Sequence, residues 1–191
     1  FDVEKLFFEC TFTVKWFIRT FLKHDLKEDA ERDILAGLRS ICEKLASKPM
    51  GLTHRDFHSR NIMVTGDRQV IIDFQDARMG IPQYDLTSIL EDCYYRLPVP
   101  TIEKLKKHYW DGFLAATKTQ SKDEYEHYYR LMAVQRVFKA CGSFAYIHGL
   151  RGDLRYVKYI GHGMERVRML LSELPEYSAT RKALYQVYYE N

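Results

Sequence analysis

Hydrophobic residues recur at helical spacing along most of this chain. In its first segment they are Leu6, Phe7, Cys10, Val14, Phe17, Ile18 and Phe21. Residues three and four apart lie on one face of a helix, so this spacing predicts an amphipathic helix over about residues 3–24. A second run with the same period predicts a helix over about residues 27–47, which Pro49 and Gly51 end.

More helices are predicted after residue 85. Their approximate ranges are 86–93, 101–118, 121–148, 153–174 and 178–189. Thr101, Ser121 and Asp153 have side chains that can cap helix N-termini, and Ser121 with Glu124 has the spacing of a capping box. The prolines of the stretch LPVP end the first of these helices, because proline cannot continue a helix.

One stretch breaks the helical pattern. The short apolar runs Ile62–Val64 and Val70–Ile72 flank the turn sequence Thr65–Arg68, which predicts a small β-hairpin. No internal repeat and no low-complexity linker is visible. The expected fold class is therefore mainly α with a small β-hairpin.

Composition limits the classes of protein. The chain has 191 residues, of which 46% are hydrophobic, so it can bury roughly 70% of its unfolded surface as one domain. Its formal net charge is +3 with acidic and basic residues interspersed, which is not the pattern of a nucleic-acid-binding surface. No signal peptide is visible, and charged residues interrupt each apolar segment before the ~20 residues that a membrane span requires. We therefore expect neither a nucleic-acid nor a membrane partner.

The cysteines lie on apolar helical stripes. They are Cys10, Cys42, Cys93 and Cys141, and no pair has C-x-x-C spacing. This pattern predicts small buried thiols rather than metal ligands or disulfides. Free thiols suit the reducing cytoplasm, which is the expected location.

The candidate chemistry lies on either side of the predicted hairpin. His54, Asp56 and Asn61 form the pattern H-x-D-x-x-x-x-N before it, and Asp73 follows it. Phosphoryl transfer needs a carboxylate near the acceptor's proton and Mg²⁺ on the phosphate oxygens. Asp56 could be that carboxylate, while Asn61 and Asp73 could supply hard oxygen ligands to Mg²⁺ from adjacent strand ends. The structural alternatives are that Asp56 only caps a turn and that His54 is a core histidine.

Three segments around this hairpin resemble the aminoglycoside phosphotransferase/choline kinase superfamily. They are His54–Asn61 (HRDFHSRN), Ile72–Ala77 (IDFQDA) and Tyr84–Leu86 (YDL). Gln135, Arg136 and the segment 151–160 also resemble the bacterial members that phosphorylate the cell-wall amino sugars N-acetylmuramate and N-acetylglucosamine at C1. The resemblance covers nearly the whole chain, but only as the family's C-terminal lobe.

The resemblance implies a role for each residue of the motifs. Asp56 would be the catalytic carboxylate, and Asn61 with Asp73 would hold the Mg²⁺ that bridges the phosphates of ATP. His54 and Asp85 would support the catalytic loop, Asp85 by accepting hydrogen bonds from the loop backbone.

Other polar residues are weaker candidates. His58 and Asp76 could bind substrate, or they could be surface residues of their loops. Arg78, Glu91 and Asp92 could line the acceptor site or face solvent.

The N-terminal lobe of that family is not recognisable in this sequence. It supplies a phosphate-covering loop and a lysine on a strand, whereas Gly161 and Gly163, the nearest approach to G-x-G-x-x-G, lie in a helical seam. The chain also begins at Phe1 rather than at a methionine. We therefore expect residues 1–191 to be a C-terminal catalytic lobe without the ATP-clamping lobe. The face where that lobe docks is then a candidate site of self-association.

Three classes of function compete. The first is an ATP- and Mg²⁺-dependent small-molecule kinase, whose expected acceptor is the anomeric hydroxyl of a cell-wall amino sugar; aminoglycosides, choline and homoserine are the alternatives. The second is a protein kinase, which is disfavoured because Gln75 follows Phe74 and the short stretch before Asp85 leaves no room for an activation segment. The third is a catalytically inactive binding module, although Asp56, Asn61 and Asp73 are all present.

Overall fold

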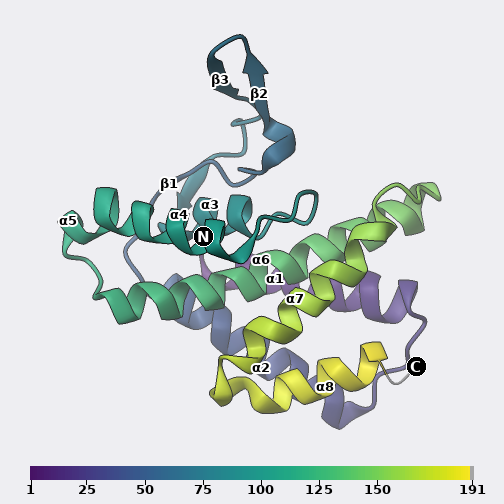
Figure 1. The fold of residues 1–191 in the computed structure, drawn as a ribbon. Coiled ribbons are helices and arrows are strands. Elements are labelled where there is room, and N and C mark those ends of the chain that lie inside the picture. Colours follow the sequence, from purple (N-terminus) through teal and green to yellow (C-terminus); the bar gives the residue numbers. More distant parts are fainter. Residues whose placement is uncertain (190–191) are drawn as a thin grey trace.

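The computed structural model describes residues 1–189, and helices make up most of its regular structure (Figure 1). Helix α1 (Val3–Thr13) continues directly into the π-helical segment η1 (Val14–Phe21), and α2 (Glu28–Ala46) follows. The Asp2 side chain caps α1 by accepting a hydrogen bond from the Lys5 N–H at 2.8 Å. The helices predicted for this part of the chain are confirmed.

The part of the chain after residue 82 is also helical. Its elements are α3 (Gln83–Leu90), α4 (Val99–Tyr109), η3 (Trp110–Leu114), α5 (Ala115–Thr117), α6 (Lys122–Arg151), η4 (Val157–Tyr159), α7 (Ile160–Ser172), η5 (Pro175–Tyr177) and α8 (Ser178–Tyr189). The predicted capping box of α6 is confirmed: the Glu124 N–H donates to Ser121 Oγ at 3.2 Å, and the Ser121 N–H donates to Glu124 Oε2 at 2.9 Å.

Two predicted caps are wrong. Helix α4 begins at Val99 after Pro98, so Pro100 lies in its first turn and Thr101 is not the cap. Proline is tolerated there because the first N–H groups of a helix have no intrahelical acceptor. Asp153 accepts a hydrogen bond from the Arg155 N–H at 2.9 Å and so closes a turn, while α7 begins only at Ile160.

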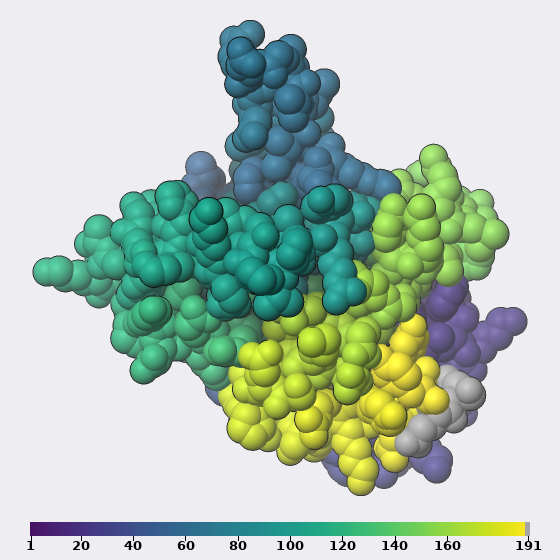
Figure 2. Space-filling view, viewed as in Figure 1, coloured from purple at the N-terminus to yellow at the C-terminus, as the bar shows by residue number. Residues whose placement is uncertain are grey.

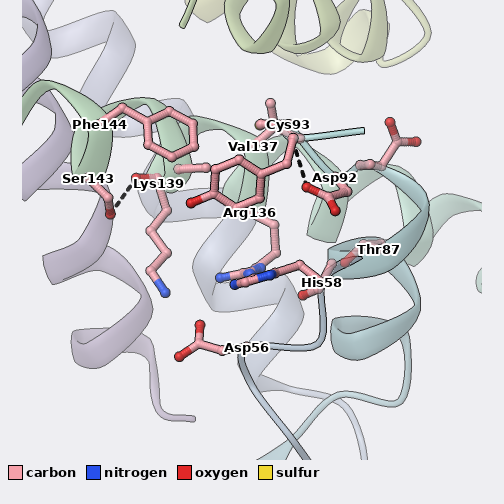
Figure 3. Close-up of a pocket in the computed structure, with 14 residues that line it drawn as sticks. Asp56, His58, Thr87, Asp92, Cys93, Arg136, Val137, Lys139, Ser143 and Phe144 are labelled. Atoms are coloured by element: carbon pink, nitrogen blue, oxygen red, sulfur yellow. Dashed lines mark hydrogen bonds between the residues drawn. The ribbon is translucent and has the colours of Figure 1, made fainter. Parts of the chain in front are cut away.

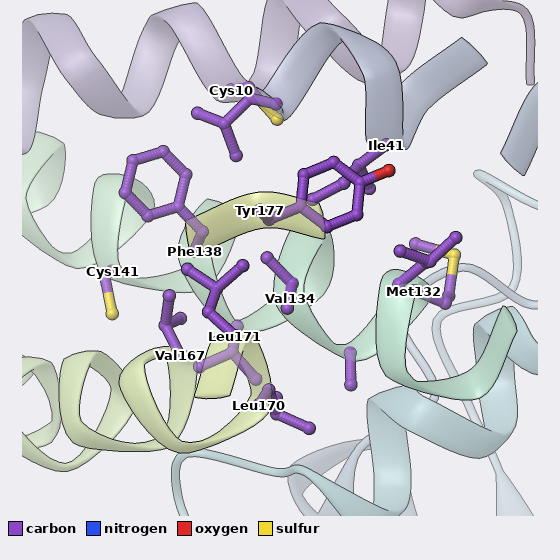
Figure 4. Packing of buried hydrophobic residues seen from close by; sticks show 14 of the residues in the cluster. Cys10, Ile41, Met132, Val134, Phe138, Cys141, Val167, Leu170, Leu171 and Tyr177 are labelled. Atoms are coloured by element: carbon purple, nitrogen blue, oxygen red, sulfur yellow. The ribbon is translucent and has the colours of Figure 1, made fainter. Parts of the chain in front are cut away.

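Helix α6 lies at the centre of the helical body. It contacts α1, η1, α2, α3 and α7, while α2 packs on α8 (Figure 1). The side chains between α6 and α7 include Phe138, Cys141, Val167 and Leu171, all at most 1% exposed (Figure 4). Burying each large apolar side chain is worth about 1.5–3 kcal/mol, so this seam fixes α6 in place.

Close approach of α1 to α6 depends on a glycine. A Cβ atom at Gly142 would lie 2.2 Å from Thr13 Oγ1 and 2.7 Å from Thr13 Cα, distances that no side chain allows. Thr13 Oγ1 donates to the Glu9 carbonyl at 3.0 Å. The contact brings the inner face of α1, with Glu9, beside the middle of α6.

The β-structure consists of two antiparallel pairs. Strand β2 (Ile62–Thr65) pairs with β3 (Arg68–Ile71) in the predicted hairpin, and Gly66 opens its turn with a φ of 59°, a conformation that favours glycine. Strands β1 (Gly51–Thr53) and β4 (Arg78–Gly80) form a second pair that the sequence analysis did not predict. The β2–β3 hairpin projects from the helical body (Figures 1 and 2).

Cys10, Cys42 and Cys141 are buried, as predicted, whereas Cys93 is only half-buried, and all four are free thiols. Within residues 1–189, no helix has the length and apolar character needed to cross a membrane.

Candidate active site

Asp85, in the first turn of α3, holds the start of the loop His54–Asn61. Its carboxylate accepts hydrogen bonds from the N–H of His54 at 2.6 Å and from the N–H of Arg55 at 2.9 Å. Arg55 has a φ of 79°, which is unfavourable for a residue with a side chain. The two hydrogen bonds from Asp85 stabilise this backbone conformation immediately before Asp56.

A second carboxylate, Asp92, holds the other half of the loop. It accepts from the Ser59 N–H at 2.9 Å and from the Tyr94 N–H at 2.7 Å, and it is only 6% exposed. The sequence offered Asp92 only as a residue that lines the acceptor site or faces solvent. No periodic pattern marks a carboxylate that binds the backbone of a distant loop, so its positioning contacts could not be read from the sequence.

His54 ties the loop to the end of the hairpin. Its Nε2–H donates to the Ile72 carbonyl at 2.9 Å, and its ring lies 5.9 Å from the ring of Phe57. Because the carbonyl oxygen can only accept, Nε2 carries the proton. His54 therefore has an architectural position between the loop and Asp73.

Asn61 and Asp73 lie at the two ends of the hairpin. The Ile72 N–H donates to the Asn61 carbonyl at 3.0 Å, so Asp73 follows directly on the residue paired with Asn61. The Asn61 Nδ2–H donates to the Asp56 carbonyl at 2.9 Å, which leaves its side-chain oxygen as an acceptor. Asp73 is exposed, and its Oδ1 accepts from Gln75 Nε2 at 3.2 Å.

This pair of oxygen donors fits Mg²⁺. No group of three or more His, Cys, Asp or Glu side chains that could hold a metal is found among the residues described. Mg²⁺ commonly binds through one or two carboxylates together with water and substrate phosphates, so a small protein ligand set suits it. Asn61 and Asp73 are the residues that would hold the ion.

The Asp56 side chain faces a cavity of about 150 Å³ between the loop, α3 and α6 (Figure 3). We call it the Asp56 pocket; it is lined by Asp56, His58, Thr87, Ser88, Glu91, Asp92, Cys93, Tyr94, Arg136, Val137, Lys139, Ala140, Ser143 and Phe144. Among residues 1–189, no group donates a hydrogen bond to the Asp56 carboxylate. A half-buried carboxylate with free oxygens beside a cavity can accept a proton from a bound molecule.

The two candidates for substrate binding differ in position. His58 lines the Asp56 pocket, where its ring meets Tyr94 edge-on at 5.3 Å, and burial lowers its pKa. Asp76 is not part of the lining; its Oδ2 lies 3.5 Å from Arg55 Nη1, and its side chain is half exposed.

Behind Asp56 lies a group of buried charges that the sequence analysis missed. Glu9 Oε1 is 3.3 Å from Arg55 Nη2 and 3.7 Å from Lys139 Nζ, and Glu9 Oε2 accepts from Gln135 Nε2 at 3.0 Å. Burial alone would raise the pKa of Glu9, but Lys139, Gln135 and the nearby arginines lower it below its ordinary value. Glu9 is therefore an ionised carboxylate in the core.

Lys139 lines the pocket together with Arg136. Burial, reinforced by the neighbouring Arg136, lowers the pKa of Lys139 to about 8. Arg136, one helical turn earlier on α6, donates from Nη1 to the Tyr84 hydroxyl at 3.3 Å. Charged residues on a long helix are usually solvent-exposed, so helical periodicity gave no sign of Lys139, and only the family resemblance had drawn attention to Arg136.

Comparison with known proteins identifies the family. The model of the phosphotransferase enzyme family matches residues 11–128 of the chain. This chain belongs to the phosphotransferase enzyme family. The loop His54–Asn61, the hairpin, Asp73 and Asp85 all lie within the matched segment, whereas Arg136 and Lys139 lie beyond it.

The chain is also similar to N-acetylmuramate/N-acetylglucosamine kinases from three bacteria. The protein from Neisseria meningitidis is 30% identical over 158 residues, which are 82% of this chain and 47% of that protein. The one from Pseudomonas aeruginosa is 28% identical over 162 residues, 82% of this chain and 48% of that protein. The one from Pseudomonas putida is 30% identical over 139 residues, 71% of this chain and 41% of that protein.

These matches confirm the family that the motifs indicated. The chain spans about half the length of the curated relatives it matches.

Proposed function

We propose that this chain is the catalytic part of an ATP- and Mg²⁺-dependent kinase that phosphorylates a sugar hydroxyl. The observation that carries the proposal is the free carboxylate of Asp56, which faces a cavity while the hairpin end beside it presents Asn61 and Asp73. Phosphoryl transfer needs this combination of an acceptor site, a carboxylate and metal-binding oxygens.

Each part of the site has a distinct task. Asp56 orients the acceptor hydroxyl and accepts its proton as the new bond to phosphorus forms. Asn61 and Asp73 hold Mg²⁺, which would neutralise charge on the phosphate oxygens. Asp85 and Asp92 hold the loop backbone and so keep Asp56 in position.

We propose an amino sugar, phosphorylated at its anomeric hydroxyl, as the acceptor. The names of the relatives and the motifs support this choice. Arg136 and Lys139 line the Asp56 pocket beside three acids, so the pocket lacks the strongly acidic character that favours a polycationic aminoglycoside. Tyr94 and Phe144 add aromatic faces on which a sugar ring can pack.

We further propose that a second lobe covers the hairpin to complete the ATP site. Leu52, Val64 and Phe74 are 78%, 74% and 70% exposed, and other large apolar side chains of the strands are exposed beside them. Such a group of apolar residues favours contact with another protein surface. The matched region covers 47% of the relative from Neisseria meningitidis, so the rest of that protein is long enough to include such a lobe.

The test is an activity assay of the full-length protein with ATP and Mg²⁺. The acceptors are N-acetylmuramate, N-acetylglucosamine, kanamycin, choline and homoserine, and the products are located by phosphorus NMR. We expect a sugar 1-phosphate. Turnover of kanamycin or an amino alcohol alone would contradict the sugar assignment, and ATP binding with no turnover of any acceptor would favour an inactive binding module.

A further inference from the structure

Three cations lie around the Asp56 carboxylate, but none of them pairs with it. Arg55 precedes Asp56 in the loop, while Arg136 and Lys139 line the same pocket from α6. The Lys139 side chain extends toward the side of the pocket where Asp56 lies (Figure 3). Among residues 1–189, however, no lysine or arginine forms an ion pair with the Asp56 carboxylate. Each cation is therefore held by another partner.

Glu9 of α1 is the partner of two of these cations. Its Oε1 lies 3.3 Å from Arg55 Nη2 and 3.7 Å from Lys139 Nζ. The Glu9 side chain is only 6% exposed, so water screens these attractions little. Gln135 Nε2 fixes the carboxylate by donating to its Oε2 at 3.0 Å. Glu9 thus holds both cations from the side of α1.

The remaining contacts of the cations also lie away from the catalytic carboxylate. Arg55 Nη1 lies 3.5 Å from Asp76 Oδ2, and Arg136 Nη1 donates to the Tyr84 hydroxyl at 3.3 Å. The three cations are balanced by three acids, which are Glu9, Asp56 and Asp76. Removing the charge of one acid would leave a cation without its partner.

A direct ion pair would impair Asp56 as the base. A carboxylate that accepts charge-assisted hydrogen bonds from lysine or arginine has its oxygens occupied by the cation. The acceptor hydroxyl needs one of those oxygens within hydrogen-bond reach. Glu9 and Asp56 lie beside the same two cations and therefore compete for them. The unpaired state of Asp56 then depends on Glu9.

We propose that Glu9 is a positioning residue, which keeps the Asp56 carboxylate free for the acceptor by binding Arg55 and Lys139 in its place. The proposal rests on the kinase function given above and adds a residue of α1 to that site. Glu9 does not line the Asp56 pocket, so it acts through the two cations rather than on the acceptor. The property that matters is its negative charge.

Glu9→Gln tests this role, because glutamine has nearly the same size but cannot balance the charge of Lys139. In the full-length protein, kcat with N-acetylglucosamine should fall about 10–100-fold, as expected when a catalytic group is misplaced. The affinity for ATP, measured by calorimetry, should change little. Glu28→Gln, at an exposed position of α2, is the matched control and should behave as the wild type.

A second substitution separates charge balance from a merely structural role. Lys139→Met alone leaves Glu9 paired with Arg55 and should lower kcat less than Glu9→Gln does. The double variant Glu9→Gln/Lys139→Met has balanced charges again, so its kcat should exceed that of Glu9→Gln and approach that of Lys139→Met. If Glu9 only supported helix packing, the two losses would add instead. Comparing the double variant with Lys139→Met does not require the single variant Glu9→Gln to fold.

Crystal structures of the variants report the geometry without any assay. In Glu9→Gln, Lys139 Nζ or an Arg55 nitrogen should lie about 2.8 Å from an Asp56 oxygen, the length of a charge-assisted hydrogen bond. An Asp56 carboxylate that stays unpaired in Glu9→Gln would overturn the proposal. So would a double variant with much lower kcat than Lys139→Met. If a cation moves to Asp56 in Glu9→Gln but the wild type phosphorylates no sugar, the proposed kinase function fails, while Glu9 remains the residue that keeps Asp56 unpaired.

Discussion

The side-chain amide of Asn61 donates a hydrogen bond to the backbone carbonyl of Asp56 at 2.9 Å. This bond joins a proposed metal ligand to the proposed catalytic carboxylate across the turn Ser59–Asn61. It fixes the amide so that its oxygen, rather than its nitrogen, is free for a cation. The proposed metal position and the proposed acceptor position are thus parts of one loop, whose backbone donates hydrogen bonds to Asp85 and Asp92.

Replacing Asp56 should remove catalysis and spare nucleotide binding. Asp56→Asn keeps the size of the side chain but cannot accept the acceptor's proton, so kcat of the full-length protein should fall by roughly 10²–10⁴. ATP affinity, measured by calorimetry, should change little. Asp25→Asn at an exposed position is the matched control. An Asp56→Asn variant with more than a tenth of wild-type kcat would exclude Asp56 as the base.

Replacing Asp73 should affect the metal. Its φ of 71° is a conformation that asparagine tolerates better than alanine, so Asp73→Asn removes the charge with little strain. We expect kcat to fall by about 10²-fold or more and the Mg²⁺ concentration for half-maximal activity to rise. Mg²⁺ titrations of activity measure both effects, and circular dichroism checks the fold. An unchanged Mg²⁺ dependence would count against Asp73 as a ligand.

Asp85 should behave as a stability residue. Asp85→Ala leaves the N–H groups of His54 and Arg55 without an acceptor, at a cost of about 1–3 kcal/mol each. The melting temperature should therefore fall by roughly 5–20 °C, and activity should fall with it. Asp85→Asn keeps one acceptor oxygen and should lose less. If activity disappeared at an unaltered melting temperature, Asp85 would instead take part in the chemistry.

The sequence predicts elements well where one local signal decides the structure. The spacing of apolar residues located α1, η1 and α2, and Ser121 with Glu124 located the start of α6. The prediction of helix caps failed at Thr101 and Asp153, because several polar residues near a helix start can either cap the helix or close a turn. Only packing against the rest of the chain selects among them.

The contrast between local signals and long-range packing also explains which site residues the sequence predicted. The motif offsets led to His54, Asp56, Asn61, Asp73 and Asp85, since a loop and a hairpin bring them together over a short stretch of chain. Lys139 and Glu9 were missed because their burial arises where α1 crosses α6 at Gly142. Helical spacing cannot show which polar face another helix covers.

The exposed apolar residues of the strands should cause residues 1–191 to self-associate when expressed alone. Val64 is 74% exposed at the hairpin, and Val99 is 63% exposed at the start of α4. Val64→Glu should therefore reduce association measured by light scattering, whereas Val99→Glu should not. Equal behaviour of the two variants would remove the hairpin from the contact.

Restoring the second lobe should create activity that the isolated chain lacks. Residues 1–191 should fold alone, since the helices share one buried core, yet they should bind ATP weakly and transfer phosphate negligibly. Holding reactants in position can contribute about 7–11 kcal/mol to phosphoryl transfer, and in the two-lobed arrangement proposed above part of that clamp belongs to the other lobe. Calorimetry with ATP and a coupled assay with N-acetylmuramate, run on residues 1–191 and on the full-length protein, measure the difference. Full activity from residues 1–191 would contradict the two-lobed proposal and require a phosphate-binding lysine within them.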